Sequence, residues 1–256
     1  MCTLIFLYRF LRGFPIVALH NRYASAGSLE GPPRVSKGRR DVYHPLDESS
    51  RGTWIGFNDE GLFLAVTDQH TGGRQPSYRS RGLLLMDALT SFADAREALG
   101  HVKAELDEGG YKRGNFIIAD FQRAYHVLND ERVEVEVLKP GLHVVTNLTV
   151  KDWMNLENTP PDVAKYANMR KGRAIELASR LKPSALPRLV DELKVMASDH
   201  GGGPDRGSIC YHGGVEWCMT SSTVMVVSGE LKGSRILYCK GNPCENRFSD
   251  YSSLVT

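Results

Sequence analysis

The chain begins with two apolar runs, residues 3–8 and 14–20, which are separated by the short segment Arg9–Gly13. Two apolar runs joined by a few polar residues predict a β-hairpin. Cys2 directly precedes the first run, so the sequence predicts a cysteine at the very start of a β-sheet.

The register of this hairpin predicts which residues approach the cysteine. If the turn centres near Leu11, Cys2 lies opposite about His20. Asn21 and Arg22 then follow at the end of the second strand, beside the start of the first. The hairpin itself is therefore expected to bring Arg22 close to the thiol.

The position of Cys2 would allow it to act as an N-terminal nucleophile. Removal of Met1, which a small second residue permits, would give one residue both a thiol and a free α-amine. The thiol is a nucleophile, and an amine with a pKa near ~8 can act as its base. The alternative is an ordinary buried cysteine that is chemically inert.

Composition predicts a globular protein that favours neither nucleic acid nor an anionic membrane. The 256 residues carry 32 basic and 30 acidic side chains, for a formal net charge of +2. No apolar run approaches the ~20 residues of a membrane helix, so no membrane span is expected. Arg9 and Arg12 interrupt the first apolar stretch, which also lacks a charged leader before it, and a cytoplasmic location follows as the default. A single domain over residues 1–256 is expected, and assembly as a homodimer is left open.

The other four cysteines are Cys210, Cys218, Cys239 and Cys244. An odd total of five in a chain of this length does not resemble a secreted disulfide framework. With His212 the last four could form a metal site, but their spacing lacks the short Cys-x-x-Cys pairs of structural zinc sites. The sequence therefore predicts no metal, and leaves buried thiols or one late disulfide as the alternatives.

The order of elements predicts an α+β protein, because strands cluster separately from helices. A second hairpin is expected over 52–67, with Asn58–Gly61 as its turn. Long loops are predicted at 24–50 and 68–82, where they would shape a pocket. Helices are predicted at 83–106, 160–181 and 184–198, and further strands at 115–121, 124–128, 133–138, 142–147, 207–212, 220–228 and 234–239.

Several short motifs, in order along nearly the whole chain, resemble the NRDE family, which includes the transport and Golgi organisation proteins of animals. They are Cys2, His20-Asn21-Arg22, Gly52-Thr-Trp-Ile-Gly56, Leu138-Lys-Pro-Gly-Leu-His-Val-Val-Thr-Asn147, Ser208-Ile-Cys-Tyr-His212 and Thr220-Ser-Ser-Thr-Val224. That family is similar in turn to the N-terminal-nucleophile hydrolases. The resemblance implies their four-layer αββα sandwich.

The resemblance also implies a reaction and the residues that perform it. Cys2 would attack the carbonyl of a linear amide, with its own amine relaying the proton, and Asn147 would donate a hydrogen bond to the oxyanion. Arg22 would favour the thiolate. Thr67-Asp68 stands where the family usually has Thr-Asn, and it would supply a backbone donor or position the amine; a loop cap is the alternative for Asp68. The expected activity is hydrolysis or acyl transfer on a small amide or acyl substrate, and no cofactor is required.

The chain also departs from the family pattern. It reads Asn21-Arg22-Tyr23-Ala24 where the family has Asn-Arg-Asp-Glu, so the Asp that would hold the amine is missing. Trp54, His20 and Tyr23 are the candidate substrate contacts, and packing in the core is the alternative for Trp54 and His20.

A carrier of haem or an acyl lipid on the same fold is the rival function. Cys or His can ligate haem iron, but a Cys-x-x-Cys-His sequence for covalent attachment is not present in the chain. Cys2 would then be a thiol ligand rather than a nucleophile.

Overall fold

A computed structural model gives the structure of residues 2–72, 79–183, 185–201 and 206–256. Within these ranges the backbone forms two β-sheets and four α-helices, which fall into two compact units. Unit 1 comprises Met1–Ser28, Pro140–Thr146 and Pro161–Thr256. Unit 2 comprises Leu29–Lys139 and Asn147–Pro160.

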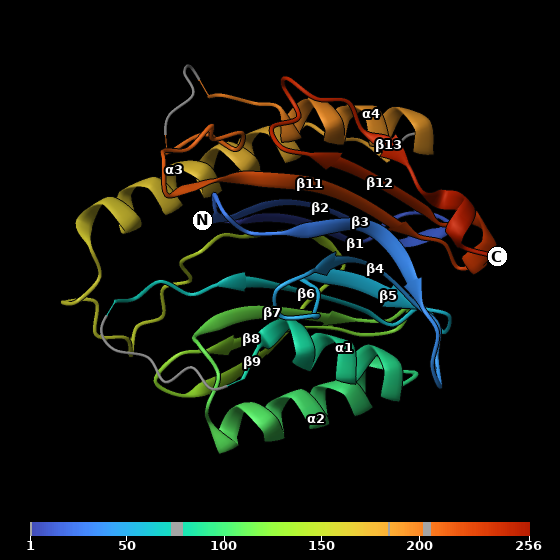
Figure 1. Ribbon diagram of the computed structural model, residues 1–256, viewed down its shortest axis with the longest axis horizontal. Helices are drawn as coiled ribbons and strands as arrows, with labels where there is room; N and C mark the ends of the chain where they lie inside the picture. The colour runs from blue at the N-terminus through green and yellow to red at the C-terminus, as the bar shows by residue number, and fades with distance from the viewer. Residues whose placement is uncertain (1, 73–78, 184, 202–205) are drawn as a thin grey trace. The chain divides into compact units, whose positions relative to one another are not determined.

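Unit 1 contains a six-stranded antiparallel sheet covered on one face by two helices (Figure 1). Its strands are β1 (Thr3–Leu11), β2 (Phe14–Ser25), β10 (Gly141–Val145), β11 (Trp217–Val227), β12 (Arg235–Lys240) and β13 (Ser249–Asp250). The helices are α3 (Pro161–Ala178) and α4 (Leu186–Ala197), with the short turns η1 (Leu231–Gly233) and η2 (Ser252–Leu254). The strand order is β10-β1-β2-β11-β12-β13, so β1 and β2 are interior strands.

The alternation of side chains along β1 and β2 determines which residues face these helices. Ile5, Val17 and Leu19 are each at most 1% exposed and pack in one cluster with Leu189 and Leu193 of α4. Burying an aliphatic side chain of this size contributes roughly 1.5–3 kcal/mol, which holds α4 on the sheet. The residues between them in sequence point to the opposite face.

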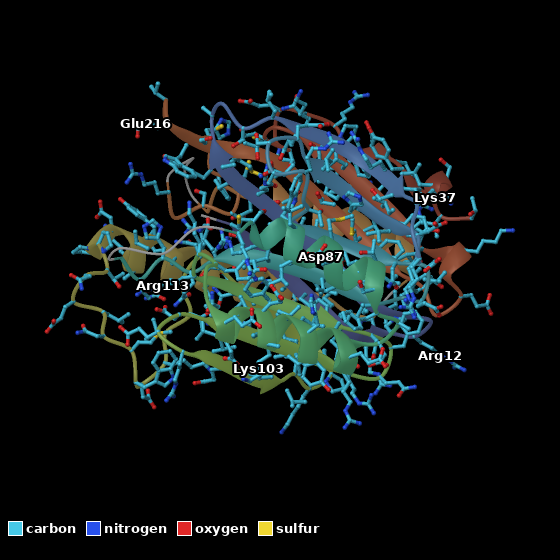
Figure 2. The ribbon with its side chains drawn as sticks, turned by 60° about the horizontal axis from the view of Figure 1, so that its bottom comes forward. Arg12, Lys37, Asp87, Lys103, Arg113 and Glu216 are labelled. Carbon is cyan, nitrogen blue, oxygen red and sulfur yellow. The ribbon has the colours of Figure 1, made fainter. Side chains whose placement is uncertain are left out.

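Unit 2 contains a seven-stranded antiparallel sheet in the simple order β3-β4-β5-β6-β7-β8-β9. Its strands are β3 (Glu30–Ser36), β4 (Val42–Asp47), β5 (Ile55–Asn58), β6 (Phe63–Asp68), β7 (Gly114–Ala119), β8 (Ala124–Asn129) and β9 (Val133–Val137). Two helices, α1 (Arg81–Ser91) and α2 (Ala95–Glu108), pack on this sheet. Asp87 on α1 and Lys103 on α2 lie on the exposed sides of these helices (Figure 2).

Both predicted hairpins are confirmed, but three other predictions from the sequence are wrong. The expected loop over 24–50 contains β3 and β4, the expected helix over 83–106 is two helices, and residues 207–212 do not form a strand. Strand β3 was missed because Pro32 and Pro33 weaken a strand pattern. Proline is tolerated there because β3 is an edge strand with a shift in register between Gly31 and Arg34.

The break between α1 and α2 has a clear cause in the sequence. Asp94 caps α2 by accepting hydrogen bonds from the backbone N–H groups of Arg96 and Glu97. Asp120 adds a further hydrogen bond at this helix start, since its carboxylate accepts from the backbone N–H of Ala95 at 2.8 Å. Asp94 with Glu97 three residues later is a helix-start signal, and it divides one apolar stripe into two helices.

The structure explains why residue 52, the first of the Gly-Thr-Trp-Ile-Gly motif, is a glycine. A Cβ at this position would lie 2.3 Å from the backbone carbonyl carbon of Gly82, at the start of α1. The Thr53 N–H donates to the Gly82 carbonyl at 3.1 Å, so the two backbones lie in direct contact. A side chain at residue 52 is therefore excluded by packing within unit 2.

Candidate functional site

The β1–β2 hairpin places Cys2 beside Arg22, as predicted, but in a register two residues away from the expected one. Thr3 pairs with Asn21 and Leu4 pairs with His20, so the same register carried one residue further sets Cys2 opposite Arg22 rather than His20. The Cys2 thiol is buried, and its Sγ lies 3.8 Å from the backbone carbonyl oxygen of Tyr23.

The two faces of this sheet carry different polar groups. On the helix face, Asn21 donates from Nδ2 to the carbonyls of Ala197 and Ile209, at 3.0 and 2.9 Å. Its Oδ1 accepts from the Ser222 hydroxyl at 2.7 Å. By alternation, His20 and Arg22 point to the other face, and Cys2, one residue before Thr3, belongs to that face as well.

Strand β11 adds two hydroxyls to the face that carries Cys2. Ser221 pairs with Arg22, and Thr223 pairs with His20. Both are completely buried, and neither hydroxyl has a hydrogen-bond partner in the described part of the chain. A buried polar group without a partner is costly, so these two hydroxyls distinguish the Cys2 face from an apolar core.

Sequence reasoning quoted the Thr220–Val224 motif without assigning these two residues a role. The available signal was the polarity of Ser221 and Thr223 inside an otherwise apolar strand, two positions apart and hence on one face.

Tyr23, which stands where the family has Asp, is anchored on the helix face. Its hydroxyl donates to the Ile209 carbonyl at 2.7 Å and accepts from the Tyr211 N–H at 2.9 Å. Burial raises the pKa of this phenol well above its usual value, so the hydroxyl remains protonated. Both hydrogen bonds tie the end of β2 to the 209–211 segment.

The remaining predicted site residues lie in unit 2. Asp68 ends β6 and forms an ion pair with Arg81, with 2.5 Å between Oδ1 and Nη2. Burial alone would raise the pKa of this carboxyl, but the Arg81 guanidinium more than offsets that and holds it well below its usual range. Trp54 is buried directly before β5, and its carbonyl accepts from the Val66 N–H at 2.9 Å.

Asn147 is completely buried, and its backbone carbonyl accepts from the His70 N–H at 2.8 Å. Val145, the last residue of β10, pairs with Leu4 of β1. Asn147 therefore lies two residues after the end of β10. Strand β10 is paired with β1, the strand that directly follows Cys2.

The predicted residues fall into two groups. Unit 1 brings together Cys2, His20 and Arg22 on one sheet face, with Tyr23 on the other, while Trp54, Asp68 and Asn147 belong to unit 2. Convergence of all these residues around Cys2 stays a prediction. The 68–82 segment, expected to shape the pocket, lies partly outside the described residues.

A second chemical cluster in unit 1 combines His200, Cys210, His212 and Cys244. Sequence reasoning considered three of the four and dismissed a metal site on cysteine spacing alone. It missed His200, which lies ten residues before Cys210 in the sequence. All five cysteines are free thiols, and burial raises the pKa of Cys210 to about 12 and that of Cys239 to about 11.

The outer surface of the helices in unit 1 also has a groove of 630 Å³ between α3 and α4. Its lining includes Leu177, Leu181 and Val195 and contains no nucleophile. Among the described helices, none is long and apolar enough to cross a membrane.

Comparison with known proteins identifies both a family and a fold. The family described as Transport and Golgi organisation 2 matches residues 1–199. Among curated proteins, none matches the sequence.

Solved structures of low sequence identity match nearly the whole chain. Penicillin V acylase from Agrobacterium tumefaciens is 13% identical with a TM-score of 0.57, covering 93% of this chain and 82% of its own. The C2A mutant of conjugated bile acid hydrolase from Clostridium perfringens is 15% identical with a TM-score of 0.56, covering 98% and 96%. An N-acylethanolamine-hydrolyzing acid amidase orthologue from Caenorhabditis elegans is 13% identical with a TM-score of 0.54, covering 88% and 92%. The α+β fold of the N-terminal-nucleophile hydrolases is thereby confirmed.

Proposed function

The chain belongs to the Transport and Golgi organisation 2 family, and on that premise we propose that it is a cysteine N-terminal-nucleophile amidohydrolase, or the related acyl transferase, which acts on linear amide bonds of a small molecule. One observation carries the proposal: a cysteine directly precedes the first strand of a fold shared with proteins named as an acylase, a hydrolase and an amidase. Fold alone does not determine activity, so the argument depends on what surrounds Cys2.

The proposed chemistry begins with removal of Met1, which gives Cys2 a free α-amine. The amine accepts the thiol proton, and the sulfur attacks the amide carbonyl carbon to form a tetrahedral oxyanion. Collapse of this intermediate breaks the C–N bond, and the departing nitrogen takes the proton from the α-ammonium. Water then hydrolyses the thioester, or a second nucleophile accepts the acyl group.

Three neighbours on the same sheet face support this role for Cys2. Arg22 lies opposite it in the strand register, and a nearby guanidinium favours the thiolate. Ser221 and Thr223 offer buried hydroxyls that have no partner among the described residues. Bound substrate would satisfy them, and a substrate without matching polar groups would be disfavoured.

Asn147 is the proposed donor to the oxyanion, and strand pairing supports it. Val145, two residues before Asn147 in the chain, is paired with Leu4, and Leu4 lies two residues after Cys2. One oxyanion donor is typically worth about 3–4 kcal/mol of the barrier. In the same proposal Asp68 positions the α-amine, while His20, Tyr23 and Trp54 help to shape the substrate site.

The first test asks whether Met1 is removed. Intact-mass measurement of the purified protein is expected to give a mass that lacks one methionine. A mature protein that retains Met1 leaves the α-amine on the wrong residue and overturns the mechanism.

The second test asks whether Cys2 is the nucleophile. Wild type, Cys2→Ser and Cys2→Ala are assayed against a library of N-acyl amides and thioesters, with Cys218→Ser as the control for losing a thiol elsewhere in unit 1. Turnover is expected to fall by at least ~10³-fold in Cys2→Ala, with substrate binding largely retained and the control unaffected. Tight stoichiometric haem binding by wild type with no hydrolysis across the library would favour the carrier instead.

A further inference from the structure

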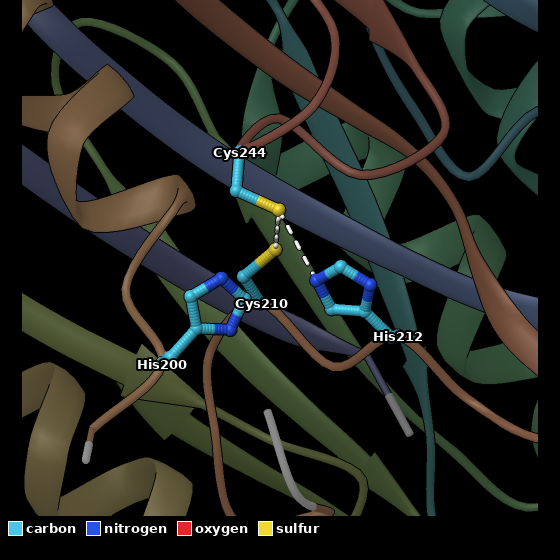
Figure 3. Close-up of side chains that lie close together, drawn as sticks. All are labelled: His200, Cys210, His212 and Cys244. Carbon is cyan, nitrogen blue, oxygen red and sulfur yellow. Dashed lines mark hydrogen bonds between the residues drawn. The ribbon is translucent and has the colours of Figure 1, made fainter. Parts of the chain in front are cut away.

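Four side chains that can ligate metal converge in unit 1 from three separate segments (Figure 3). His200 follows the end of α4, Cys210 and His212 precede β11, and Cys244 follows β12. One donor atom from each of the four lies within 4.8 Å of all the others. Residues 34 positions apart in the sequence are thus brought to one point by the fold.

Two of the distances between donor atoms are close to those around a tetrahedral zinc ion. Cys210 Sγ and Cys244 Sγ are 3.6 Å apart, and Cys244 Sγ is 3.2 Å from His212 Nε2. Zn–S bonds of about 2.3 Å and Zn–N bonds of about 2.0 Å imply separations of roughly 3.8 Å between sulfurs and roughly 3.5 Å between sulfur and nitrogen. These two distances fall short of the tetrahedral values by only a few tenths of an ångström, and the other donor pairs lie within 4.8 Å.

Neighbouring polar groups orient the ligands as they do around known zinc sites. Glu245 Oε1 lies 3.4 Å from His212 Nδ1, so the carboxylate holds this nitrogen and leaves Nε2 directed at Cys244. The Asn242 amide donates to the Cys210 sulfur at 3.5 Å. His200 Nδ1 is buried and has no hydrogen-bond partner in the described segments.

We propose that His200, Cys210, His212 and Cys244 form a structural zinc site. Two thiolates and two imidazoles are the N/S donor set that selects Zn²⁺, and four protein ligands close the coordination sphere. Zn²⁺ displaces the two thiol protons to solvent, with no change in oxidation state. A Cys210–Cys244 disulfide accounts for the cluster less well, because the sulfurs are 3.6 Å apart rather than about 2.05 Å and two imidazoles also converge.

This zinc would brace the strand that carries Arg22. Cys210 lies between Ile209 and Tyr211, the two residues whose backbones hold the Tyr23 hydroxyl. Fixing Cys210 therefore fixes the anchor for the end of β2. The proposal does not depend on amidohydrolase activity, because its ligands are separate from the proposed catalytic residues.

The test uses the full-length protein, purified under reducing conditions. Metal analysis is expected to find one zinc per chain. After removal of zinc with a chelator, titration with Co²⁺ is expected to give the thiolate-to-cobalt charge-transfer band and the intense visible bands of a tetrahedral site. Both signals should reach their end-point at one equivalent, and zinc should reverse them.

Variants assign the ligands. Cys244→Ser and His212→Gln change side chains that are exposed or half-buried, so the fold should survive, and both are expected to abolish stoichiometric zinc and the cobalt bands. Glu245→Gln removes only the orienting carboxylate and is expected to weaken zinc binding ~10–100-fold. Cys218→Ser, a nearby cysteine outside the donor set, should leave binding unchanged.

Three results would overturn the proposal. The first is wild-type protein that binds neither zinc nor cobalt after full reduction. The second is a Cys244→Ser variant that retains stoichiometric zinc. The third is a Cys210–Cys244 disulfide, found by peptide mapping of protein purified without reductant, in a chain that takes up no zinc once reduced.

Discussion

The buried polar groups around Asp130 in unit 2 and those on the Cys2 face of unit 1 differ in their hydrogen bonding. In unit 2 the Asp130 carboxylate, with a side chain only 2% exposed, accepts from Arg113, Gln69 and Thr71 at 2.9–3.0 Å. In unit 1 the hydroxyls of Ser221 and Thr223 are buried without partners among the described residues. A satisfied network stabilises a fold, whereas an unsatisfied buried hydroxyl destabilises it and calls for an explanation.

This contrast indicates where function should be sought. The thiols of Cys2 and Cys210, the four-residue His/Cys cluster and the hydroxyls of Ser221 and Thr223 all belong to unit 1. In unit 2 the buried polar side chains that are described are mostly bound to one another or to the backbone, as in the pairing of Asn115 with His126 at 3.0 Å. The expected outcome is that substitution of Cys2 changes chemistry and substitutions in the Asp130 network of unit 2 change stability.

Asn147→Ala is the strongest way to break this comparison, because Asn147 belongs to unit 2. If it holds the oxyanion, kcat on an amide found by screening should fall ~10²–10³-fold with little change in Tm. Asn129→Ala is the matched control, since Asn129 is another buried asparagine of unit 2 and donates to the Lys112 carbonyl at 3.2 Å. An equal loss of kcat in both variants, or a full loss of folding in Asn147→Ala, would assign Asn147 a structural role.

Asp130→Asn should show the structural character of unit 2 most clearly. The substitution leaves the Arg113 guanidinium without its charge partner and is expected to cost about 3 kcal/mol in the free energy of unfolding, measured by urea denaturation. Asp107→Asn, at an ion pair with Lys103 in which both side chains are nearly half exposed, should cost less than about 1 kcal/mol. A cost at Asp130 no larger than at Asp107 would contradict a structural network here.

Tyr23→Phe tests the connection between the two candidate sites of unit 1. Loss of the hydroxyl leaves the buried Tyr211 N–H without its acceptor, at a cost of about 1–3 kcal/mol in unfolding free energy. Since this segment also carries Cys210, zinc affinity should fall in the same variant. Tyr125→Phe, the same substitution at a half-buried position of unit 2, is the control and should change neither.

Local sequence patterns predicted much of this fold because they report short-range physics. The first hairpin, the Asn58–Gly61 turn and helices α3 and α4 follow from apolar period and turn residues, and all are present. The register was harder: Arg12–Gly13, rather than Leu11, forms the first turn, which moved the partner of Cys2 from His20 to Arg22.

The Cys210 cluster could not be predicted from spacing because its members meet only after β2, β11 and β12 pair. Cysteine spacing reports sites built on one short loop, whereas here His200 and Cys244 lie 44 positions apart in the sequence. Ser221 and Thr223 were hidden for a related reason. A polar residue in a strand signals a site only once its face and neighbours are known.

Asp68→Asn should have the smallest effect on stability. The Asp68 side chain is 36% exposed, so solvent screens its pairing with Arg81 and the cost at pH 7 should stay below about 1 kcal/mol. Because Arg81 holds the folded-state pKa of Asp68 below its unfolded value near ~3.9, this contribution is present above that value. It is lost as the pH falls through the lower, folded-state pKa.

Urea midpoints of wild type and Asp68→Asn should therefore differ slightly at pH 7 and converge as the pH is lowered below ~4. Lys37→Ala with Asp41→Ala, measured singly and together, provides the scale of an ordinary surface pair in the same unit. If Asp68 positions the amine of Cys2, as proposed, Asp68→Asn also lowers turnover more than tenfold. That result would remove Asp68 from the structural side of the comparison and extend the chemistry of unit 1 into unit 2.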